Sequence, residues 1–432
     1  MNSKKKTPVM KEEAKPAPVP KLRFSEFRGV ALRRVKLCDV TEEGRRRNGK
    51  KHSVAAVMGV TKADGIVPMA ARLIAADIER YKLVEHDWFA YNPMRLNIGS
   101  IARWKGGSEI LVSPDYVVFK CITVDESGIA PSYFDHFRQS KAWQDFVTEG
   151  GDGGVRVRIY YKDIARLQLA LPSLSEQQKI AECLSSVDEL IAVHARKVDA
   201  LKTHKKGLMQ QFFPREGETQ PRFRFPEFRN AGEWKEKRTD EWGEVLAGKA
   251  LAVNAPGPLR PYLRTKNVLD GAIDVSDVLT MPMTDAEFSR FEVLDGDILL
   301  NEGQSLGLVG RASIYRGEFG QRCAMQNQLL RFRAFPSTCP EFAAQAFRQC
   351  QKDGTFASIA TQTTSVAHLG SSRFSALRLT WPRSLAEQQR IATCLSSLDA
   401  LISAETQKLE ALKTHKKGLM QQLFPSAGEP AA

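Results

Sequence analysis

The strongest constraint on the fold of this chain is a 39-residue segment that occurs twice. Residues 176–214 (EQQKIAECLSSVDELIAVHARKVDALKTHKKGLMQQFFP) and 387–425 (EQQRIATCLSSLDALISAETQKLEALKTHKKGLMQQLFP) are identical at 27 of 39 positions. The two copies lie 211 residues apart in a chain of 432. A repeat this long, placed late in each half, indicates two similar modules that are each followed by the same element.

The repeated segment has the apolar spacing of a coiled-coil helix. Seam positions recur at alternating steps of four and three residues, from Ile180 to Phe212 and from Ile391 to Leu423. A heptad pattern sustained in this way is the strong form of the coiled-coil signal. We therefore expect one long helix at the end of each half.

Both helix starts have candidate caps. Ser175 with Gln178, and Ser384 with Glu387, have the spacing of a capping box, in which side chains satisfy the exposed amides of the first turn. Each repeated segment ends in a proline, which stops a helix.

Since no other long helix is predicted, the two copies should pair with each other. Parallel pairing would place both modules at one end, whereas antiparallel pairing needs less crowding and is the arrangement we favour. His194 and Glu405 hold the same polar seam position and would face each other in the antiparallel pair, although two solvated side chains are the alternative. Lys205 and Lys416 are expected to extend their charged ends into solvent.

The repeat continues outside the helices. PKLRFSEFR at 20–28 returns as PRFRFPEFR at 221–229, and the apolar positions of 164–172 recur at 374–382. Between these segments the halves diverge, so one scaffold carries two different surfaces. The predicted organisation is a disordered basic arm (1–20), a first module (21–171), a central helix (172–214), a linker (215–220), a second module (221–381), a C-terminal helix (382–425) and a tail (426–432).

Each module has the pattern of an α+β fold, with short β-branched and aromatic runs between glycine turns. Predicted strands are 117–124, 155–161, 298–300 and 329–333. Predicted shorter helices are 69–81, 133–147 and 340–352. The predicted fold class is therefore α+β, with two similar modules and an antiparallel coiled coil related by a pseudo-two-fold.

The charge of the chain favours a polyanionic partner. Lys and Arg number 63 against 50 Asp and Glu, giving a net charge of +13, which suits nucleic acid; a basic protein without such a partner is the alternative. No apolar run approaches the roughly 18 residues of a membrane span, and the start lacks the apolar stretch of a signal peptide. We expect a cytoplasmic protein with no membrane partner.

Sequence-specific binding to DNA needs Arg, Lys, Asn or Gln at base edges and further cations at phosphates. The segment 45–51 should be a loop that contacts phosphates, and cations surround Trp104. A plain surface position is the alternative for each residue taken singly. The candidates are Arg45, Arg46, Arg47, Lys50, Lys51, Arg95, Arg103 and Lys105 in the first module, and Arg264, Lys266, Asn301, Gln304, Arg311, Gln326, Asn327 and Gln328 in the second.

These motifs together resemble the specificity subunit of type I restriction–modification systems. The likeness rests on the helix entry at Leu174–Ala181, the THKKGLMQQxFP ending, the RFxEF segment and their duplication, and it covers roughly residues 20–425. Residues 91–100 with 113–116 are similar to one subtype of that family's target recognition domains, and 294–300 with 309–311 resemble another.

The resemblance implies a non-catalytic subunit that recognises a bipartite, asymmetric target in double-stranded DNA. Each module would be a target recognition domain for one half-site, and the coiled coil would set the spacer between them. The implied partners are two methyltransferase subunits and restriction subunits. S-adenosylmethionine, ATP and magnesium are implied for those partners, with no cofactor bound by this chain.

Two other classes of function remain as alternatives. For an enzyme, residues 243–250 fit a phosphate-binding loop except that Ala250 replaces the Ser or Thr that should hold magnesium. Asn92-Pro93 lacks the second proline and aromatic residue of an amino-methyltransferase, Pro114-Asp115 lacks the rest of a nuclease motif, and the histidines have no metal-ligand spacing. The other alternative is a scaffold whose helices bind partner helices without contacting DNA.

Overall fold

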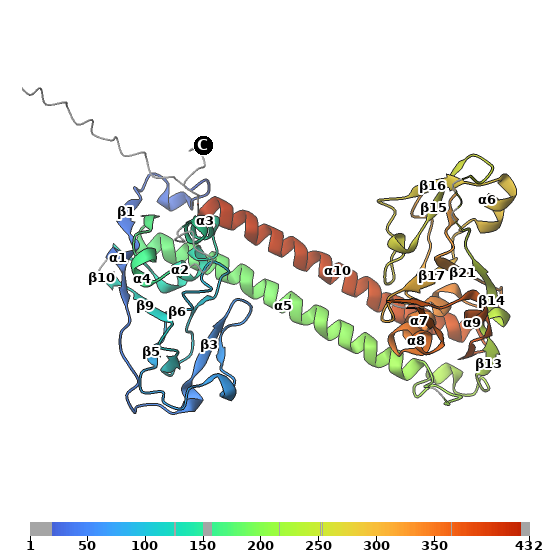
Figure 1. The fold of residues 1–432 in the computed structure, drawn as a ribbon, viewed down its shortest axis with the longest axis horizontal. Coiled ribbons are helices and arrows are strands. Elements are labelled where there is room, and N and C mark those ends of the chain that lie inside the picture. The colour runs from blue at the N-terminus through green and yellow to red at the C-terminus, as the bar shows by residue number, and fades with distance from the viewer. Residues whose placement is uncertain are drawn as a thin grey trace, which may run out of the picture. The chain divides into compact units, whose positions relative to one another are not determined.

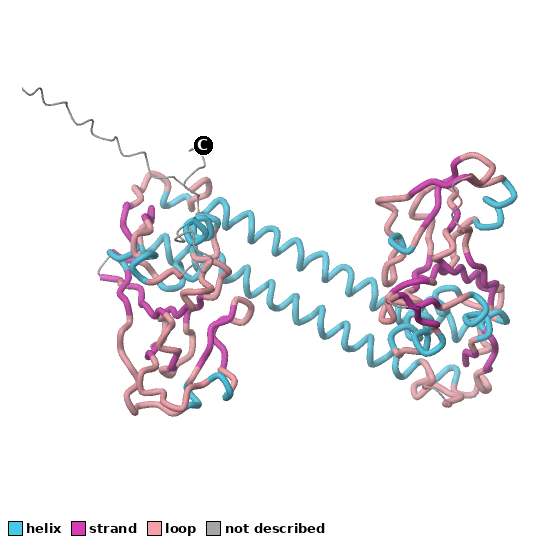
Figure 2. The backbone as a smooth tube through the Cα atoms, in the orientation of Figure 1, coloured by secondary structure: helices cyan, strands magenta, loops and turns pink. Residues whose placement is uncertain are grey.

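The computed structural model describes residues 20–124, 127–149, 158–215, 217–250, 252, 254–363 and 365–424. Its contacts divide the chain into unit 1, residues 1–194 with 408–432, and unit 2, residues 195–407. Figure 1 shows the helices and strands of both units, and Figure 2 distinguishes them by type.

The two long helices are α5 (Leu174–Phe212) and α10 (Leu385–Leu423), each of 39 residues. Both are continuous, and each contributes one part to unit 1 and the other to unit 2. The predicted pair of repeated helices is therefore present (Figure 1).

In unit 2 the helix segments run in opposite directions. Lys197 Nζ lies 2.5 Å from Glu405 Oε1, and Lys205 Nζ lies 2.6 Å from Asp399 Oδ1. The partner's residue number on α10 thus decreases as the residue number on α5 increases. The preference for antiparallel over parallel pairing is confirmed.

Unit 1 repeats this arrangement with the other helix ends. Lys416 Nζ lies 2.7 Å from Asp188 Oδ1, and Leu184 shares an apolar cluster with Met420 and Leu423. Asp188 and Asp399 are equivalent repeat positions, as are Lys205 and Lys416, so the same ion pair recurs in each unit.

Two seam predictions are affected by these pairs. Lys205 and Lys416 do not extend into solvent, because an aspartate on the opposite helix holds each of them; only 7% of the Lys205 side chain is exposed. Glu405 pairs with Lys197, and the proposed facing of His194 and Glu405 stays a prediction.

The helix caps differ from the prediction in one copy. Ser384 Oγ accepts from the Glu387 N–H at 3.4 Å, as expected, whereas at the start of α5 Ser173 Oγ accepts from the Glu176 N–H at 3.3 Å. The predicted cap at Ser175 is wrong because α5 already begins at Leu174. Ser173 is therefore the repeat equivalent of Ser384.

Unit 1 is built on a four-stranded antiparallel sheet in the order β2 (Thr41–Glu43), β9 (Val117–Cys121), β6 (Phe89–Tyr91), β7 (Ile101–Arg103). The rings of Phe89 and Phe119 stack with centroids 5.2 Å apart and meet Phe134 of α2 edge-on. The sheet core thus packs against α2, one of the short helices of unit 1. The helices are α1 (Leu37–Val40), α2 (Pro131–Phe137), α3 (Lys141–Glu149) and α4 (Tyr161–Ile164).

Strand pairs complete unit 1. They are β1 (Arg33–Lys36) with β12 (Gln168–Leu171), β3 (Met58–Thr61) with β4 (Gly65–Pro68), β5 (Lys82–Val84) with β8 (Ile110–Val112), and β10 (Thr123–Val124) with β11 (Ser127–Gly128). Short 3-10 helices are η1 (Ser25–Phe27), η2 (Val54–Ala56) and η3 (Ala71–Leu73).

Unit 2 has the same central topology. Its antiparallel sheet has the order β14 (Gly243–Ala247), β21 (Leu329–Ala334), β17 (Ile298–Asn301), β19 (Ala312–Ile314). In both units the last of these four strands along the chain lies between the first and the second. The two modules are therefore similar α+β folds despite their divergent sequences.

The remaining elements of unit 2 surround this sheet. The helices are α6 (Asp285–Phe291), α7 (Pro340–Lys352), α8 (Thr355–Ile359) and α9 (Ser371–Ala376), with η4 (Pro226–Phe228), η5 (Thr239–Glu241) and η6 (Thr265–Asn267). The other sheets are β16 (Leu279–Pro282)–β15 (Leu259–Leu263)–β20 (Ala324–Met325), β18 (Gly303–Gln304)–β23 (Val366–His368)–β22 (Thr361–Thr363), and β13 (Lys235–Arg238)–β24 (Arg378–Trp381).

Most predicted elements inside the modules are present. The strands predicted at 117–124, 298–300 and 329–333 correspond to β9 with β10, to β17 and to β21, and the helix predicted at 340–352 is α7. The helix predicted at 133–147 is divided into α2 and α3. Of the strand predicted at 155–161, residues 155–157 lie outside the described part, and Tyr161 begins α4 instead. The predicted arm, apart from Pro20, and the tail at 426–432 also lie outside it.

The helix predicted at 69–81 is wrong, since only η3 forms there. Backbone carbonyls at the end of this segment accept hydrogen bonds from a neighbouring loop. Asn48 N–H donates to Tyr81 O at 2.8 Å, Gly49 N–H to Glu79 O at 3.0 Å, and the Asn48 side chain to Ile78 O at 3.3 Å. Tertiary contacts therefore override the local helix preference.

Candidate nucleic-acid interface

Strand ends in unit 2 bring several of the predicted DNA-contact residues together. Asn301 is the last residue of β17, Gln304 lies in β18, and Gln328 directly precedes β21. The Glu302 N–H donates to Gln328 O at 2.8 Å, so the two segments are neighbours. These candidates, which come from separate segments of the sequence, therefore lie close together in the fold.

Four amide side chains at this place are available for a ligand. Gln304, Gln326, Asn327 and Gln328 are all half-buried, and within the described part of the chain none of their amides has a hydrogen-bond partner. We call these four residues the amide cluster. An amide offers both a donor and an acceptor, which is the combination that a base edge presents.

Asn301 differs from these four because it is wholly buried. In the orientation that satisfies its neighbours, its amide oxygen accepts from Arg311 Nε and Nη2, each at 3.2 Å. A side chain with no exposed surface cannot contact a base in this conformation. Asn301 instead positions Arg311, which is half-buried and stays a candidate for DNA contact.

Arg264 and Lys266 share one carboxylate beside the amide cluster. Arg264 Nη2 and Lys266 Nζ each lie 2.6 Å from Asp277 Oδ2. The hydrogen bond from Lys266, together with both cationic charges, lowers the pKa of Asp277. One carboxylate between two cations leaves an excess of positive charge, as a phosphate contact requires.

Two further residues at this place were missed by the sequence prediction. His368 Nδ1 lies 3.0 Å from Glu302 Oε2, and β23 pairs with β18 so that His368 stands opposite Gly303. No local signal could reveal this pair, because 66 residues separate its members. A search for polar residues in β-hairpins, rather than for Arg and amides alone, would have included His368.

In unit 1 the segment 45–51 is a loop, as predicted, and carboxylates pair with its cations other than Arg47. Arg46 pairs with Glu85, and Lys51 Nζ lies 2.5 Å from Glu109 Oε2. The other loop contacts are Arg45 Nη2 to Glu43 Oε2 at 2.9 Å, Lys50 Nζ to Glu79 Oε1 at 3.7 Å, and Arg47 Nη1 donating to Arg80 O at 2.7 Å.

Glu109 is the shared partner of this loop. It accepts from Lys51 and, at 2.9 Å, from His52 Nε2, and Arg46 lies 3.6 Å away. The Lys51 and His52 hydrogen bonds lower the pKa of Glu109 to about 2. Its negative charge therefore opposes the phosphate contacts predicted for the same cations.

Arg103 and Lys105 meet at another carboxylate of unit 1. Asp135 Oδ2 lies 3.3 Å from Arg103 Nε and 3.1 Å from Lys105 Nζ, and Asp135 Oδ1 lies 2.7 Å from Arg138 Nη2. Burial alone would raise the pKa of Asp135, but the charges of Arg138 and Lys105 overcome burial and lower it. Arg95 is exposed in the turn after β6, and within the described part of the chain no ion pair joins it to Asp135.

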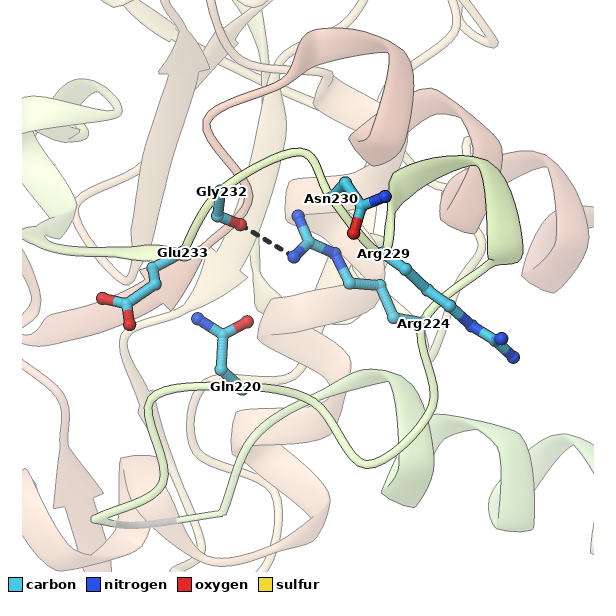
Figure 3. A pocket seen from close by; sticks show the side chains of 6 residues that line it. All are labelled: Gln220, Arg224, Arg229, Asn230, Gly232 and Glu233. Carbon is cyan, nitrogen blue, oxygen red and sulfur yellow. Dashed lines mark hydrogen bonds between the residues drawn. The ribbon is translucent and has the colours of Figure 1, made fainter.

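One cavity of unit 2 lies elsewhere. It has a volume of about 500 Å³ and is lined by Gln220, Arg224, Arg229, Asn230, Gly232 and Glu233. Arg224 Nη1 donates to Gly232 O at 2.7 Å, and Figure 3 shows Arg229 directed away from the other lining side chains. None of the predicted DNA-contact residues lines this cavity, so we do not assign DNA recognition to it.

The segment that partly matches a phosphate-binding loop has no such conformation. Residues Gly243–Ala247 form β14, which pairs with β21 over its whole length. A strand bonded in a sheet does not offer the row of free amides that cradles phosphates.

Along the described residues, no helix has both the length and the apolar character that crossing a membrane requires.

The fold and these surfaces define a duplicated two-module protein that presents hydrogen-bonding and cationic side chains suited to nucleic acid. The chain belongs to the family described as the type I restriction modification DNA specificity domain. The model of that family matches residues 124–203 and 232–414, which is more than half of the chain.

Two curated relatives carry the same designation. The chain is 26% identical over 165 residues to a protein of Methanocaldococcus jannaschii named as the MjaX specificity subunit of a type I restriction enzyme, covering 38% of this chain and 39% of that protein. It is 23% identical over 237 residues to the type I restriction enzyme EcoKI specificity subunit of Escherichia coli strain K12, covering 50% of this chain and 47% of that protein. The matches thus span less than half the length of these relatives.

Solved structures share the fold over nearly the whole chain. The S subunit of a type I restriction-modification system from M. genitalium has a TM-score of 0.59 at 12% identity, with 94% of this chain and 99% of that chain covered. A structure that describes complex assembly and conformational transition of the type I R-M system has a TM-score of 0.51 at 15% identity, with 91% and 98% covered. At these identities the likeness establishes the fold alone.

Proposed function

We propose that this chain is the non-catalytic DNA-specificity subunit of a type I restriction–modification complex. Each module recognises one half of a bipartite, asymmetric target in double-stranded DNA. The observation that carries the proposal is the amide cluster of unit 2. Its four amides have no hydrogen-bond partner among the described residues and suit base edges, on a member of the specificity-domain family.

The partners follow from the proposed role. The chain recruits two methyltransferase subunits and, where the host has them, restriction subunits. S-adenosylmethionine, ATP and magnesium belong to those partners, and this chain binds no cofactor of its own. Since the target is the host's DNA, we place the protein in the cytoplasm.

The test is to express the chain with its cognate methyltransferase subunits and to map modified adenines across a genome. One bipartite motif with a fixed spacer supports the proposal. The absence of a motif, or a motif that does not depend on this chain, contradicts it. The purified chain alone should neither methylate nor cut DNA.

We also propose that α5 and α10 set the length of the unrecognised spacer. Seven residues inserted into each helix at equivalent repeat positions would keep the heptad pattern and add roughly 10 Å. The spacer should then lengthen by about three base pairs at 3.4 Å each, with both half-sites unchanged. An unchanged spacer in the modification motif would contradict this role of the helices.

A further inference from the structure

We propose that His368, oriented by Glu302, contacts a base edge and sets the preference at one position of the half-site that the unit 2 module recognises. This inference rests on the proposed function and names a specificity-determining residue within it. His368 is the last residue of β23 and Glu302 directly precedes β18, and both lie beside the amide cluster.

The strand geometry turns His368 toward the surface. Ala367 and Leu369, its two neighbours in sequence, are wholly buried. Since successive side chains of a strand point to opposite faces, His368 occupies the other face, and 34% of its side chain is exposed. The imidazole is therefore accessible to a ligand.

Glu302 determines which ring nitrogen is free. An ionised carboxylate can only accept hydrogen bonds, so the 3.0 Å contact between Nδ1 and Glu302 Oε2 places the proton on Nδ1. In the neutral ring Nε2 then carries a lone pair. Within the described part of the chain, no hydrogen-bond partner occupies Nε2.

Gly303 allows the imidazole to lie next to the amide cluster. A Cβ atom at this position would lie 2.2 Å from Gln328 Oε1 and 3.2 Å from His368 Cε1. Any other residue would displace these two side chains. The strand thus brings an amide and an imidazole together from segments far apart in the sequence.

Arg373 fixes the backbone that carries His368. Its Nη2 donates to His368 O at 2.8 Å and to Thr361 Oγ1 at 2.9 Å, and its Nε donates to Leu369 O at 3.1 Å. These bonds join α9 to both strands of the hairpin β22–β23. A recognition side chain on a rigid element is held more accurately than one on a free loop.

The chemistry of Nε2 selects one class of base. In the major groove adenine and cytosine present an exocyclic amino group, whereas guanine and thymine present oxygen acceptors at the corresponding edge. A lone pair on Nε2 accepts from an amino group and repels an oxygen. We therefore expect adenine or cytosine at the position that His368 contacts.

The experiment uses the full chain in complex with its methyltransferase subunits and maps the modified sites for wild type, His368→Ala, Glu302→Gln and Gln328→Ala. The matched control is His204→Ala, which changes an exposed histidine of the same unit outside the site. In His368→Ala one position of the half-site affected by Gln328→Ala should lose its preference by about tenfold or more, the amount of a single base contact. The other half-site and the control should be unchanged.

Glu302→Gln gives an independent test that keeps the side-chain volume. An amide can accept from Nδ1 or donate to it, so Nε2 can be either an acceptor or a donor. The same position should then admit guanine or thymine as well as adenine or cytosine. Thermal melting of each variant confirms that it is folded.

The outcomes separate this inference from the proposed function. A wild-type complex without any bipartite motif contradicts the proposed function. A wild-type motif that stays unchanged in folded His368→Ala and in Glu302→Gln contradicts the assignment of His368 alone. A change confined to the half-site that Gln328→Ala does not affect also overturns the assignment.

Discussion

Arg224 donates to both carboxylate oxygens of Glu387, with Nε 2.7 Å from Oε1 and Nη2 2.8 Å from Oε2. Trp234 Nε1 adds a third hydrogen bond at 3.1 Å. Arg224 belongs to the RFxEF segment and Glu387 to the first turn of α10, so two of the repeated motifs are in direct contact. Arg23 and Glu176 make the equivalent bidentate pair in unit 1.

Removal of Arg224 should destabilise unit 2 strongly. The Glu387 side chain is 1% exposed, and Arg224→Ala would leave it buried without its main charge partner. The expected loss is about 3 kcal/mol of unfolding free energy, as for other broken buried pairs. Urea unfolding followed by tryptophan fluorescence measures this loss.

The control for this prediction is Arg222→Ala, since the pair of Arg222 with Glu218 is exposed. That variant should unfold within about 0.5 kcal/mol of wild type. The double variant Arg224→Ala/Glu387→Leu should recover part of the loss, because it removes the buried charge as well. Equal stability of Arg224→Ala and Arg222→Ala would show that the pair does not stabilise the unit.

The pair of Lys205 and Asp399 should respond to charge exchange. Burial lowers the pKa of Lys205, and Arg348 and Gln345 also contact Asp399, at 3.0 and 2.9 Å. Lys205→Asp should cost about 2 kcal/mol of stability, and a second change, Asp399→Lys, should restore part of that amount. Denaturant unfolding of the four proteins in this cycle gives the coupling free energy.

Lys413→Asp is the matched control for that cycle, because Lys413 pairs with Glu410 on the exposed face of a single helix. Its cost should be a few tenths of a kcal/mol. A coupling free energy near zero between positions 205 and 399 would refute the antiparallel contact in unit 2.

His136 should make unit 1 less stable in acid. Burial lowers the pKa of His136 to about 4; Asp188 and Asp135 oppose this shift, and Lys416 and Lys105 add to it. Between pH 6.5 and 4 the unfolded chain binds a proton that the folded unit does not. The contribution of His136 to the free energy of unfolding is therefore complete above pH 6.5. It decreases by up to about 3 kcal/mol as the pH falls to 4.

His136→Gln tests this assignment, because glutamine is the residue at the corresponding position of unit 2. Gln345 holds the equivalent position of α7 and donates to Asp399 at 2.9 Å, so glutamine is compatible with the site. The difference in unfolding free energy between variant and wild type, measured from pH 7 to 4.5, should move in favour of the variant as pH falls. Parallel pH profiles would mean that His136 titrates alike in the folded and unfolded chains.

The long helices could be predicted because their signal is local and repeated. A heptad seam and a terminal proline lie within one segment, and these identified α5 and α10 to within a few residues. The α+β class followed from short strand patterns in the same way. The helix prediction for 69–81 failed because carbonyls at the end of this segment accept hydrogen bonds from Asn48 and Gly49. No local sequence pattern encodes that contact.

The candidate site was only partly predictable for a similar reason. Residue type led to Gln304, Gln328 and Asn301 alike as candidates for ligand contact. Burial is a tertiary property, and Asn301 is wholly buried, whereas contact of a ligand with Gln304 and Gln328 stays a prediction. The pairing of His368 with Glu302 depends on the register of β18 against β23. Which cations are neutralised, as Lys51 is by Glu109, depends on the fold as well.

Glu109 should restrain DNA binding by the loop 45–51. Its pKa of about 2 keeps it ionised at every pH at which DNA binding is measured, so it competes with phosphate for Lys51, His52 and Arg46. Glu109→Gln removes this competition without a change in side-chain size. The variant should bind non-specific duplex DNA several-fold more tightly at low salt, and log K should fall with log salt more steeply by about one unit per phosphate gained.

Salt-dependent binding of the purified chain to a labelled duplex measures both quantities. Glu410→Gln is the control, because Glu410 pairs with Lys413 on α10 and lies outside the loop. Lys51→Gln should act in the opposite direction, with weaker binding and a shallower slope, if Lys51 is the cation that Glu109 restrains. Identical slopes for wild type, Glu109→Gln and Lys51→Gln would place the phosphate contacts of unit 1 elsewhere, with Arg103 and Lys105 as the next candidates.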